Sequence, residues 1–205
     1  MIRRADGIRA ARHDELPLLR EIELASGAPF RDIGMTEIAD AEPLSVAELE
    51  HYQRRDRALV STGRGVPVAF LLAEPVDQYL HIAQVSVHPR AAGRRLGSGL
   101  IEHLARLAVA EGVDGLCLTT YLDVPWNAPY YRRLGFVDLP PARQRTGLRT
   151  IRELERAAGL DRWPRLVMVR PLGRRPAAGG STLTRCAAGQ PVGSILARHR
   201  ETTLG

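Results

Sequence analysis

The sequence predicts an α/β fold of the α+β type, in which a mixed, mostly antiparallel sheet is flanked by helices. The chain has 205 residues, of which 44% are hydrophobic, which is enough for one sizeable core. Short apolar runs joined by glycine turns indicate antiparallel strands. The segment 79–120 reads as strand, helix and strand, the unit that places two strands in parallel.

The expected elements follow one another closely along the chain. The strands are expected at 8–11, 58–62, 66–73, 79–87, 115–120, from 136 onward, and at 165–170. The helices are expected at 14–26, 45–55, 100–108, 129–134 and 148–158.

Capping residues and turns predict the first elements. An aspartate and a glycine, both typical of helix ends, bracket 14–26, and the prolines of 27–44 favour a loop after it. Ser45 and Glu48 match a capping box at the start of the second helix. The segment 63–65, Gly-Arg-Gly, separates two apolar runs and predicts a β-hairpin.

Periodicity and stop signals predict the later elements. Apolar residues at 100, 101, 104, 107 and 108 share one face of a helix. Gly135 follows the short helix as a suitable residue for its C-terminal end. The runs GLCLTT and RLVMVR, at 115–120 and 165–170, are typical of buried strands.

The charge of the chain argues against nucleic-acid binding. All 29 basic residues are arginine, and the formal net charge is +6. Residues 173–205 contain five arginines and one glutamate, so +4 of that charge lies there and +2 lies on 1–172. A nucleic-acid-binding domain carries a basic stripe within its fold, so we expect no nucleic-acid partner.

We expect one domain over 1–172 and a disordered tail over 173–205, which has few large apolar groups. No apolar run is long enough to span a membrane, and the N-terminal segment does not resemble a secretory signal. Cys117 and Cys186 are too few for a disulfide framework. These features predict a cytoplasmic protein with no membrane partner, and no metal site is expected.

The stretch VSVHPRAAGRRLGSGL, residues 85–100, predicts an anion-binding loop between a strand and a helix. A helix N-terminus attracts phosphate through its unpaired amides, and glycines let a bulky anion approach. A Walker A loop needs a lysine, which this chain lacks, and the lone Gly97-Ser98-Gly99 lies too far beyond the strand for a dinucleotide fingerprint. The remaining candidate ligand has a pyrophosphate and a long neutral arm.

This loop resembles the coenzyme A loop of the GNAT family of N-acetyltransferases, whose pattern Arg/Gln-x-x-Gly-x-Gly/Ala falls on 92–97. Ala92 stands for the Arg or Gln and Arg95 for the first Gly, whereas Gly97 is kept. The segment VPWNAPYYRRLGF, 124–136, is similar to the family's Asn and Tyr-x-x-Leu-Gly-Phe motif. The resemblance covers residues 8 to about 170 and implies the family's fold, with two strands that splay at the acetyl-CoA site.

The resemblance implies a role for each matching residue. The backbone of Val85, Ser86 and Val87 would pair with the pantetheine amides. Asn127 would contact the cofactor arm, and Tyr131 would lie near the thioester sulfur and donate a proton. The loop residues whose amides would hold the pyrophosphate are Gly93, Arg94, Arg95, Leu96, Gly97 and Ser98.

Each assignment has a structural alternative. Val85 and Val87 are equally suitable as core residues, and Asn127 is suitable as a helix N-cap. Tyr131 can be a core aromatic before the Leu-Gly-Phe stop, and Arg94 with Arg95 can be a solvated face.

The general base is left open. Many family members carry a glutamate on the strand before the loop, but this chain has Gln84 there, and an amide cannot take a proton. His81 is the nearest titratable side chain on that strand, and its ordinary pKa of about 6.5 suits a base. A relay through water is the alternative.

The implied activity is the transfer of an acetyl group from acetyl-CoA to an amine, on a small molecule or a protein, by direct attack. A protein of this fold that binds acyl-CoA as a sensor without turnover is the alternative. Members of the family often form dimers, and the sequence leaves the oligomeric state of this chain open.

Overall fold

The computed structural model describes residues 6–173, so the tail expected over 173–205 lies, except for its first residue, outside the described residues. The chain divides into two compact units. The first unit comprises Met1–Glu74 and Ile82–Leu104, and the second unit comprises Pro75–His81 and Ala105–Gly205.

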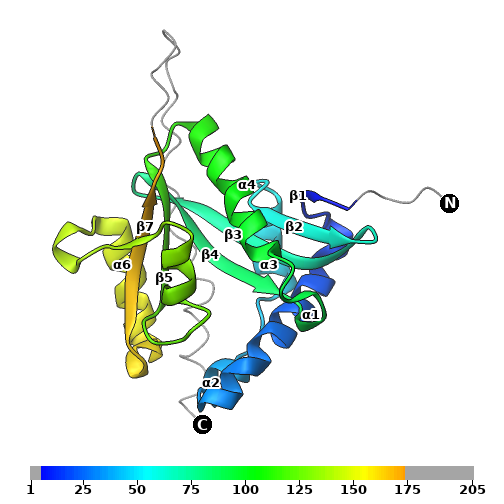
Figure 1. The fold of residues 1–205 in the computed structure, drawn as a ribbon, viewed down its shortest axis with the longest axis horizontal. Coiled ribbons are helices and arrows are strands. Elements are labelled where there is room, and N and C mark those ends of the chain that lie inside the picture. Colours follow the sequence, from blue (N-terminus) through cyan, green and yellow to red (C-terminus); the bar gives the residue numbers. More distant parts are fainter. Residues whose placement is uncertain (1–5, 174–205) are drawn as a thin grey trace, which may run out of the picture. The chain divides into compact units, whose positions relative to one another are not determined.

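The helices and strands follow the predicted order (Figure 1). The strands are β1 (Ile8–Ala10), β2 (Ala58–Gly63), β3 (Val66–Val76), β4 (Tyr79–Val87), β5 (Gly115–Tyr121), β6 (Val137–Asp138) and β7 (Arg165–Pro171). The α-helices are α1 (Leu16–Gly27), α2 (Thr36–Ala39), α3 (Val46–Gln53), α4 (Leu96–Glu111), α5 (Ala128–Arg133) and α6 (Thr146–Ala157).

The strands form a mixed sheet in the order β1-β2-β3-β4-β5-β7-β6. β2 is antiparallel to both β1 and β3, and β7 is antiparallel to both β5 and β6. β4 pairs in parallel with β5, with His81 opposite Cys117. The predicted α/β fold with a mostly antiparallel sheet, and the parallel strand–helix–strand unit within it, are therefore confirmed.

One segment was predicted wrongly. Residues 27–44 were expected to form a loop, but the structure has a 3-10 helix over Ala28–Ile33 and the short helix α2. Pro29 lies in the first turn of the 3-10 helix, where a missing N–H costs no hydrogen bond, so this proline starts a helical turn and does not prevent one.

The capping box before α3 is confirmed. The Glu48 amide donates to the Ser45 hydroxyl at 3.3 Å, and the Ser45 amide donates to the Glu48 carboxylate at 2.7 Å. The hairpin between β2 and β3 is also confirmed, with Arg64 and Gly65 both at positive φ. Its two turn residues thus have the backbone conformation that two-residue hairpins favour.

Each unit has its own buried cluster of apolar residues. In the first unit α1 and α3 pack on β2 and β3, through a cluster that includes Leu19, Leu49, Tyr52, Val60 and Phe70. In the second unit α6, which lies beside β7 in Figure 1, packs on β5 and β7 through a cluster that includes Leu148, Ile151, Cys117, Val167 and Val169. Cys117 is fully buried, as its apolar surroundings in the sequence predict.

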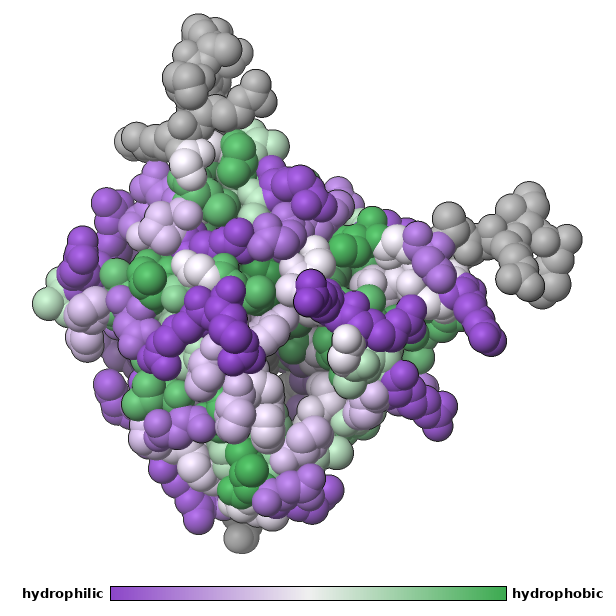
Figure 2. All heavy atoms as spheres, viewed as in Figure 1, coloured by the Kyte–Doolittle hydropathy of each residue, from purple (hydrophilic) through white to green (hydrophobic). Residues whose placement is uncertain are grey.

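Hydrophilic residues cover most of the face drawn in Figure 2, with apolar residues in small groups among them. None of the helices within residues 6–173 has the length and hydrophobicity that a membrane span requires.

Candidate functional site

The end of β4 is the first part of the predicted site. Val85 and Val87 are half-buried, whereas Ser86 between them is buried at 4% exposure. The Gln84 side-chain amide donates to the Ser86 hydroxyl at 3.1 Å. The two valines therefore do not belong to the fully buried core, and the part of the strand that carries them is only partly covered.

The loop after β4 turns through two left-handed residues. Gly93 has φ +74° and Arg95 has φ +57°. A Cβ at Gly93 would meet no atom within 4 Å, so the backbone conformation, and not crowding, favours glycine there. Arg95 holds the second left-handed position with a side chain, although this conformation is costly for residues other than glycine. The family pattern has a glycine at this second position.

The N-terminus of α4 follows at Leu96. In a helix that begins there, the amides of the first residues have no acceptor within the helix. The Ser98 hydroxyl donates to the Arg95 carbonyl at 2.9 Å and so does not cap these amides. Gly97 is buried, while Arg94 and Arg95 are exposed and form no ion pair with any described residue. The turn therefore combines amides that have no acceptor within the helix with two exposed positive charges that no described residue compensates.

Asn127 precedes α5 in the second unit. Its carbonyl accepts the Tyr131 amide at 3.0 Å, and its own amide donates to the Val124 carbonyl at 2.9 Å. It occupies the N-cap position, but its side chain makes no capping hydrogen bond. The backbone of Asn127 thus forms the start of the helix, while its side-chain carboxamide stays available for a ligand. The N-cap alternative is therefore right about the position of Asn127 but wrong about a capping role for its side chain.

Tyr131 lies on α5 with its ring packed and its hydroxyl unused. The ring makes edge contacts with Phe136, at 5.6 Å between centroids, and with Tyr130, at 5.4 Å. Burial, and to a smaller degree Tyr130, raises the pKa of Tyr131 above its ordinary value. Within residues 6–173 the hydroxyl makes no hydrogen bond. A phenol in this state remains protonated throughout the neutral range and is able to donate to a ligand.

His81 lies inside the sheet, buried at 6% exposure and opposite Cys117 in the ladder. Gln84, further along β4, is half-buried, and its carbonyl oxygen has no hydrogen-bond partner among the described residues. Neither residue has a feature that identifies it as the base. His81 as base stays a prediction.

The predicted residues thus form two groups. Val85, Ser86, Val87 and the loop residues Gly93–Ser98 are in the first unit, where one continuous segment carries them. Asn127 and Tyr131 are one helical turn apart in the second unit, and His81 also belongs to that unit, on the part of β4 that precedes Val85.

A buried charged cluster in the second unit was not predicted from the sequence. The Glu155 carboxylate accepts hydrogen bonds from the Thr119 hydroxyl and from the guanidinium groups of Arg152 and Arg165. Burial raises the pKa of Glu155, but the charge of Arg165 and these hydrogen bonds outweigh it and lower the pKa below its ordinary value. The sequence does contain a signal for a buried charge. Glu155 lies at helical spacing from Leu148 and Ile151, on the apolar face of the helix.

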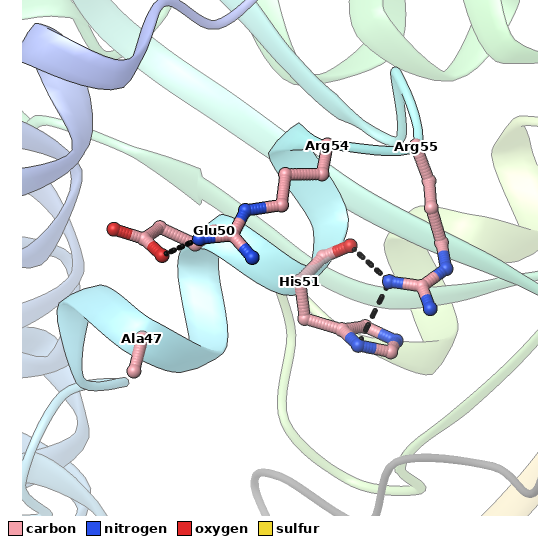
Figure 3. Close-up of a pocket in the computed structure, with 5 residues that line it drawn as sticks. All are labelled: Ala47, Glu50, His51, Arg54 and Arg55. Carbon is pink, nitrogen blue, oxygen red and sulfur yellow. Dashed lines mark hydrogen bonds and ion pairs between the residues drawn. The ribbon is translucent and has the colours of Figure 1, made fainter.

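A groove of about 560 Å³ lies along α3 and is lined by Ala47, Glu50, His51, Arg54 and Arg55 (Figure 3). Its charged groups bind one another. Arg54 donates to Glu50 at 2.6 Å, and Arg55 donates to the His51 carbonyl at 2.8 Å and contacts its ring nitrogen at 2.9 Å. The groove contains none of the predicted site residues.

A second cleft, of about 480 Å³, lies in the second unit between β6, α6 and β7, and it also contains none of them. In the part of the chain that the structure describes, no three His, Cys, Asp or Glu side chains are grouped as metal ligands would be.

Comparisons with known proteins agree with this architecture. The structure is similar to the ribosomal-protein-S18-alanine N-acetyltransferase from Escherichia coli, with a TM-score of 0.58 and 18% identity over 86% of this chain and 100% of that one. It is also similar to the PaiA N-acetyltransferase from Thermoplasma acidophilum in complex with coenzyme A, with a TM-score of 0.60 and 12% identity over 82% and 100%.

Ard1 from Thermoplasma volcanium gives a TM-score of 0.60 and 18% identity over 83% of this chain and 100% of that one. At these identities the likeness concerns the fold. The model of the acetyltransferase (GNAT) family matches residues 20–136, which is more than half of the sequence. The chain therefore belongs to the GNAT family of acetyltransferases.

Proposed function

We propose that this protein is an N-acetyltransferase that transfers the acetyl group of acetyl-CoA to an amine by direct attack. The observation that carries the proposal is the turn before α4, where Gly93 and Arg95 are left-handed and the first amides of the helix follow. This arrangement suits a bound phosphate group. Family membership supports the same reaction class.

The residues of the turn fit a coenzyme A pyrophosphate in charge as well as in shape. Arg94 and Arg95 are exposed beside the helix N-terminus, and residues 88–99 contain no Asp or Glu. The amides of Leu96, Gly97 and Ser98 would donate to the phosphate oxygens. The backbone of Val85–Val87 would pair with the pantetheine amides. When bound, acetyl-CoA supplies the activated acyl group as a thioester.

The amine must lose a proton before it attacks. For an alkylammonium with a pKa near 10.4, the neutral form costs about 4–5 kcal/mol at pH 7. Gln84 can accept a hydrogen bond from the amine but cannot take its proton. His81, or a chain of waters, would remove that proton.

The leaving sulfur needs a proton or a hydrogen bond. Tyr131 is protonated, and its hydroxyl is not used by the described residues, so we assign it the role of proton donor to the thiolate. A backbone amide of Val85 or Val87 would polarise the thioester carbonyl. Asn127, whose carboxamide caps no helix, would bind the cofactor arm.

The test is the release of free thiol from acetyl-CoA over a panel of amines, together with calorimetric binding of acetyl-CoA. An N-acetyltransferase binds acetyl-CoA and releases thiol only when a suitable amine is present. The sensor alternative has two observations in its favour, namely Gln84 in place of a carboxylate and Arg95 in place of a glycine. Tight acetyl-CoA binding without thiol release over the whole panel would favour the sensor.

A further inference from the structure

The cleft of the second unit is built by the segment between β6 and β7, which contains α6. Its volume is about 480 Å³, and four of the residues that line it are arginines, namely Arg149, Arg152, Arg156 and Arg165. The first three are spaced i, i+3 and i+7 on α6, so they follow one face of that helix. Arg165 comes from β7.

The carboxylates that compensate these arginines do not line the cleft. Glu155 binds Arg165 at 2.7 Å and is also bound by Arg152. Asp161 binds Arg152 at 2.6 Å and Arg156 at 3.2 Å. Neither Glu155 nor Asp161 is among the lining residues. The wall of the cleft therefore contains arginine side chains, while the carboxylates that pair with them are not part of that wall.

Two of these guanidinium groups are fixed in place. The Arg165 Nη2 atom donates to Glu155 and, at 3.2 Å, to the Thr119 hydroxyl, and its guanidinium carbon lies 4.4 Å from the centre of the Tyr121 ring. Arg152 is held between Glu155 and Asp161. A wall that is already ordered loses little side-chain entropy when a ligand binds.

Arg149 differs from the other three arginines. It is exposed, and its side chain makes no hydrogen bond or ion pair with any residue of 6–173. Two carboxylates also line the cleft. Asp138 is bound by Arg132 at 2.9 Å, which leaves Glu153 as the one uncompensated carboxylate of the described lining. Arg149 is thus the arginine that is available to pair with an incoming anion.

Most of the remaining wall is apolar, and the net charge of the cleft is small. Leu139, Pro140, Leu166 and Val167 line the cleft beside the arginines. Arg152, Arg156 and Arg165 against Glu155 and Asp161 leave one positive charge, and the unpaired Arg149 and Glu153 add one charge of each sign. This balance suits a monoanion better than a dianion, and the apolar wall suits a short aliphatic stem.

The lining of the cleft begins a few residues after the predicted proton donor in the sequence. Phe136 contacts the Tyr131 ring at 5.6 Å and is followed directly by β6, whose Asp138 lines the cleft. Arg132, the neighbour of Tyr131 on α5, holds that aspartate. The two features therefore share one short segment of the second unit.

We propose that this cleft binds the carboxylate of the acceptor, so that the substrate is an amine that carries a carboxylate on a short aliphatic stem. Arg149 makes the ion pair with this carboxylate, while Arg152 and Arg165 form the fixed cationic wall. This assignment of the substrate class rests on the proposed acetyltransferase function.

The experiment compares two acceptors of equal length, 5-aminopentanoate and pentylamine, in the full-length protein. We expect kcat/KM to favour 5-aminopentanoate by at least about tenfold, and Arg149→Gln to remove most of that preference through KM while pentylamine is unaffected. Arg145→Gln is the matched control, because Arg145 is exposed on the same segment and does not line the cleft. It should preserve the preference within about twofold.

A second measurement does not depend on turnover. Pentanoate, a monoanion that carries the carboxylate and the stem but no amine, should bind the wild type and Arg145→Gln, and should bind Arg149→Gln at least about fivefold more weakly by calorimetry. Pentanoate binding with this pattern but no thiol release from any amine would support the cleft and reject the acetyltransferase proposal. Equal acetylation of the two amines, equal losses for both amines in Arg149→Gln, or no pentanoate binding would overturn the cleft proposal.

Discussion

The turn before α4 and the α6 segment are both rich in arginine, yet the two regions use this residue in opposite ways. In the turn, Arg94 and Arg95 are exposed and form no ion pair with the described residues. The turn is defined by its backbone conformation, which is left-handed at Gly93 and Arg95. In the α6 segment, Arg152 and Arg165 are largely buried and pair with Glu155. The carboxylates nearby, and not the number of arginines, decide what each cluster does.

This difference separates two kinds of site. The turn offers backbone amides, which every residue except proline possesses, so its side chains are open to change. The second unit depends on particular side-chain groups, such as the Tyr131 hydroxyl and the Glu155 carboxylate. Substitutions should therefore have their largest effects in the second unit and smaller effects in the turn.

The largest effect is expected for Glu155→Gln. The change leaves Arg152 and Arg165 without the carboxylate that compensates them, and we expect the free energy of unfolding to fall by about 3–5 kcal/mol. Urea denaturation of the mutant and of Glu153→Gln measures this loss. Glu153 is exposed on the same helix, so its variant should differ from the wild type by less than about 0.5 kcal/mol.

The same carboxylate predicts a dependence of stability on pH. The pKa of Glu155 is lower in the folded protein than in the unfolded chain, because its arginine partners outweigh the effect of burial. The ionised Glu155 carboxylate therefore stabilises the folded protein fully at a pH above its pKa in the unfolded chain, near 4.3. This stabilisation is lost as the pH falls through its pKa in the folded protein. The difference in stability between the wild type and Glu155→Gln should shrink below about pH 4. A constant difference down to pH 3 would show that the charge of Glu155 is unimportant.

The next largest effect is expected for Tyr131→Phe. The substitution keeps the ring that packs on Phe136 and removes only the hydroxyl, so stability and acetyl-CoA affinity should stay near those of the wild type. A proton-donor role predicts that kcat falls by about 10²-fold or more in steady-state thiol release. Tyr130→Phe is the control on the neighbouring residue and should change kcat by less than about twofold. Turnover of Tyr131→Phe within twofold of the wild type would remove this residue from the mechanism.

The smallest effect is expected for Arg95→Gly, which tests the turn. Glycine relieves the left-handed conformation, and we expect a gain in stability of about 1 kcal/mol. Loss of the guanidinium should weaken coenzyme A binding by about 1–3 kcal/mol, less so at high salt.

Arg64→Gly is the matched control for this change. Arg64 is also an exposed left-handed arginine, in the hairpin between β2 and β3, so the variant should gain similar stability without any change in coenzyme A affinity. If Arg95→Gly binds coenzyme A more tightly than the wild type does, Arg95 does not contact a phosphate.

The order of the elements was predictable because it depends on local signals. The capping box of Ser45 and Glu48 and the glycine turn at 63–65 act between residues close in sequence, and both are present as expected. The segment 27–44 was misjudged because its prolines lie where a helical turn begins, a position that tolerates them.

The candidate site was predictable where it depends on a linear motif. The turn of Gly93 and Arg95 and the α5 segment with Asn127 and Tyr131 each follow from a short stretch of sequence. The cluster around Glu155 was not predicted, because Thr119 and Arg165 come to this carboxylate from two strands distant in the chain. Helical spacing reveals that Glu155 is on the buried face, but not which residues compensate its charge.

The ion pairs that hold this fold together have a chemical consequence for a protein proposed to handle acetyl-CoA. Lysine is absent from the whole sequence, so arginine takes every position at which a primary ammonium group could have served. A lysine in such a position loses its charge when it is acetylated, whereas a guanidinium remains protonated at every physiological pH and is a very poor nucleophile. No side chain in this sequence can therefore become an acetyl-lysine, and its arginine salt bridges are inert toward the reactive thioester.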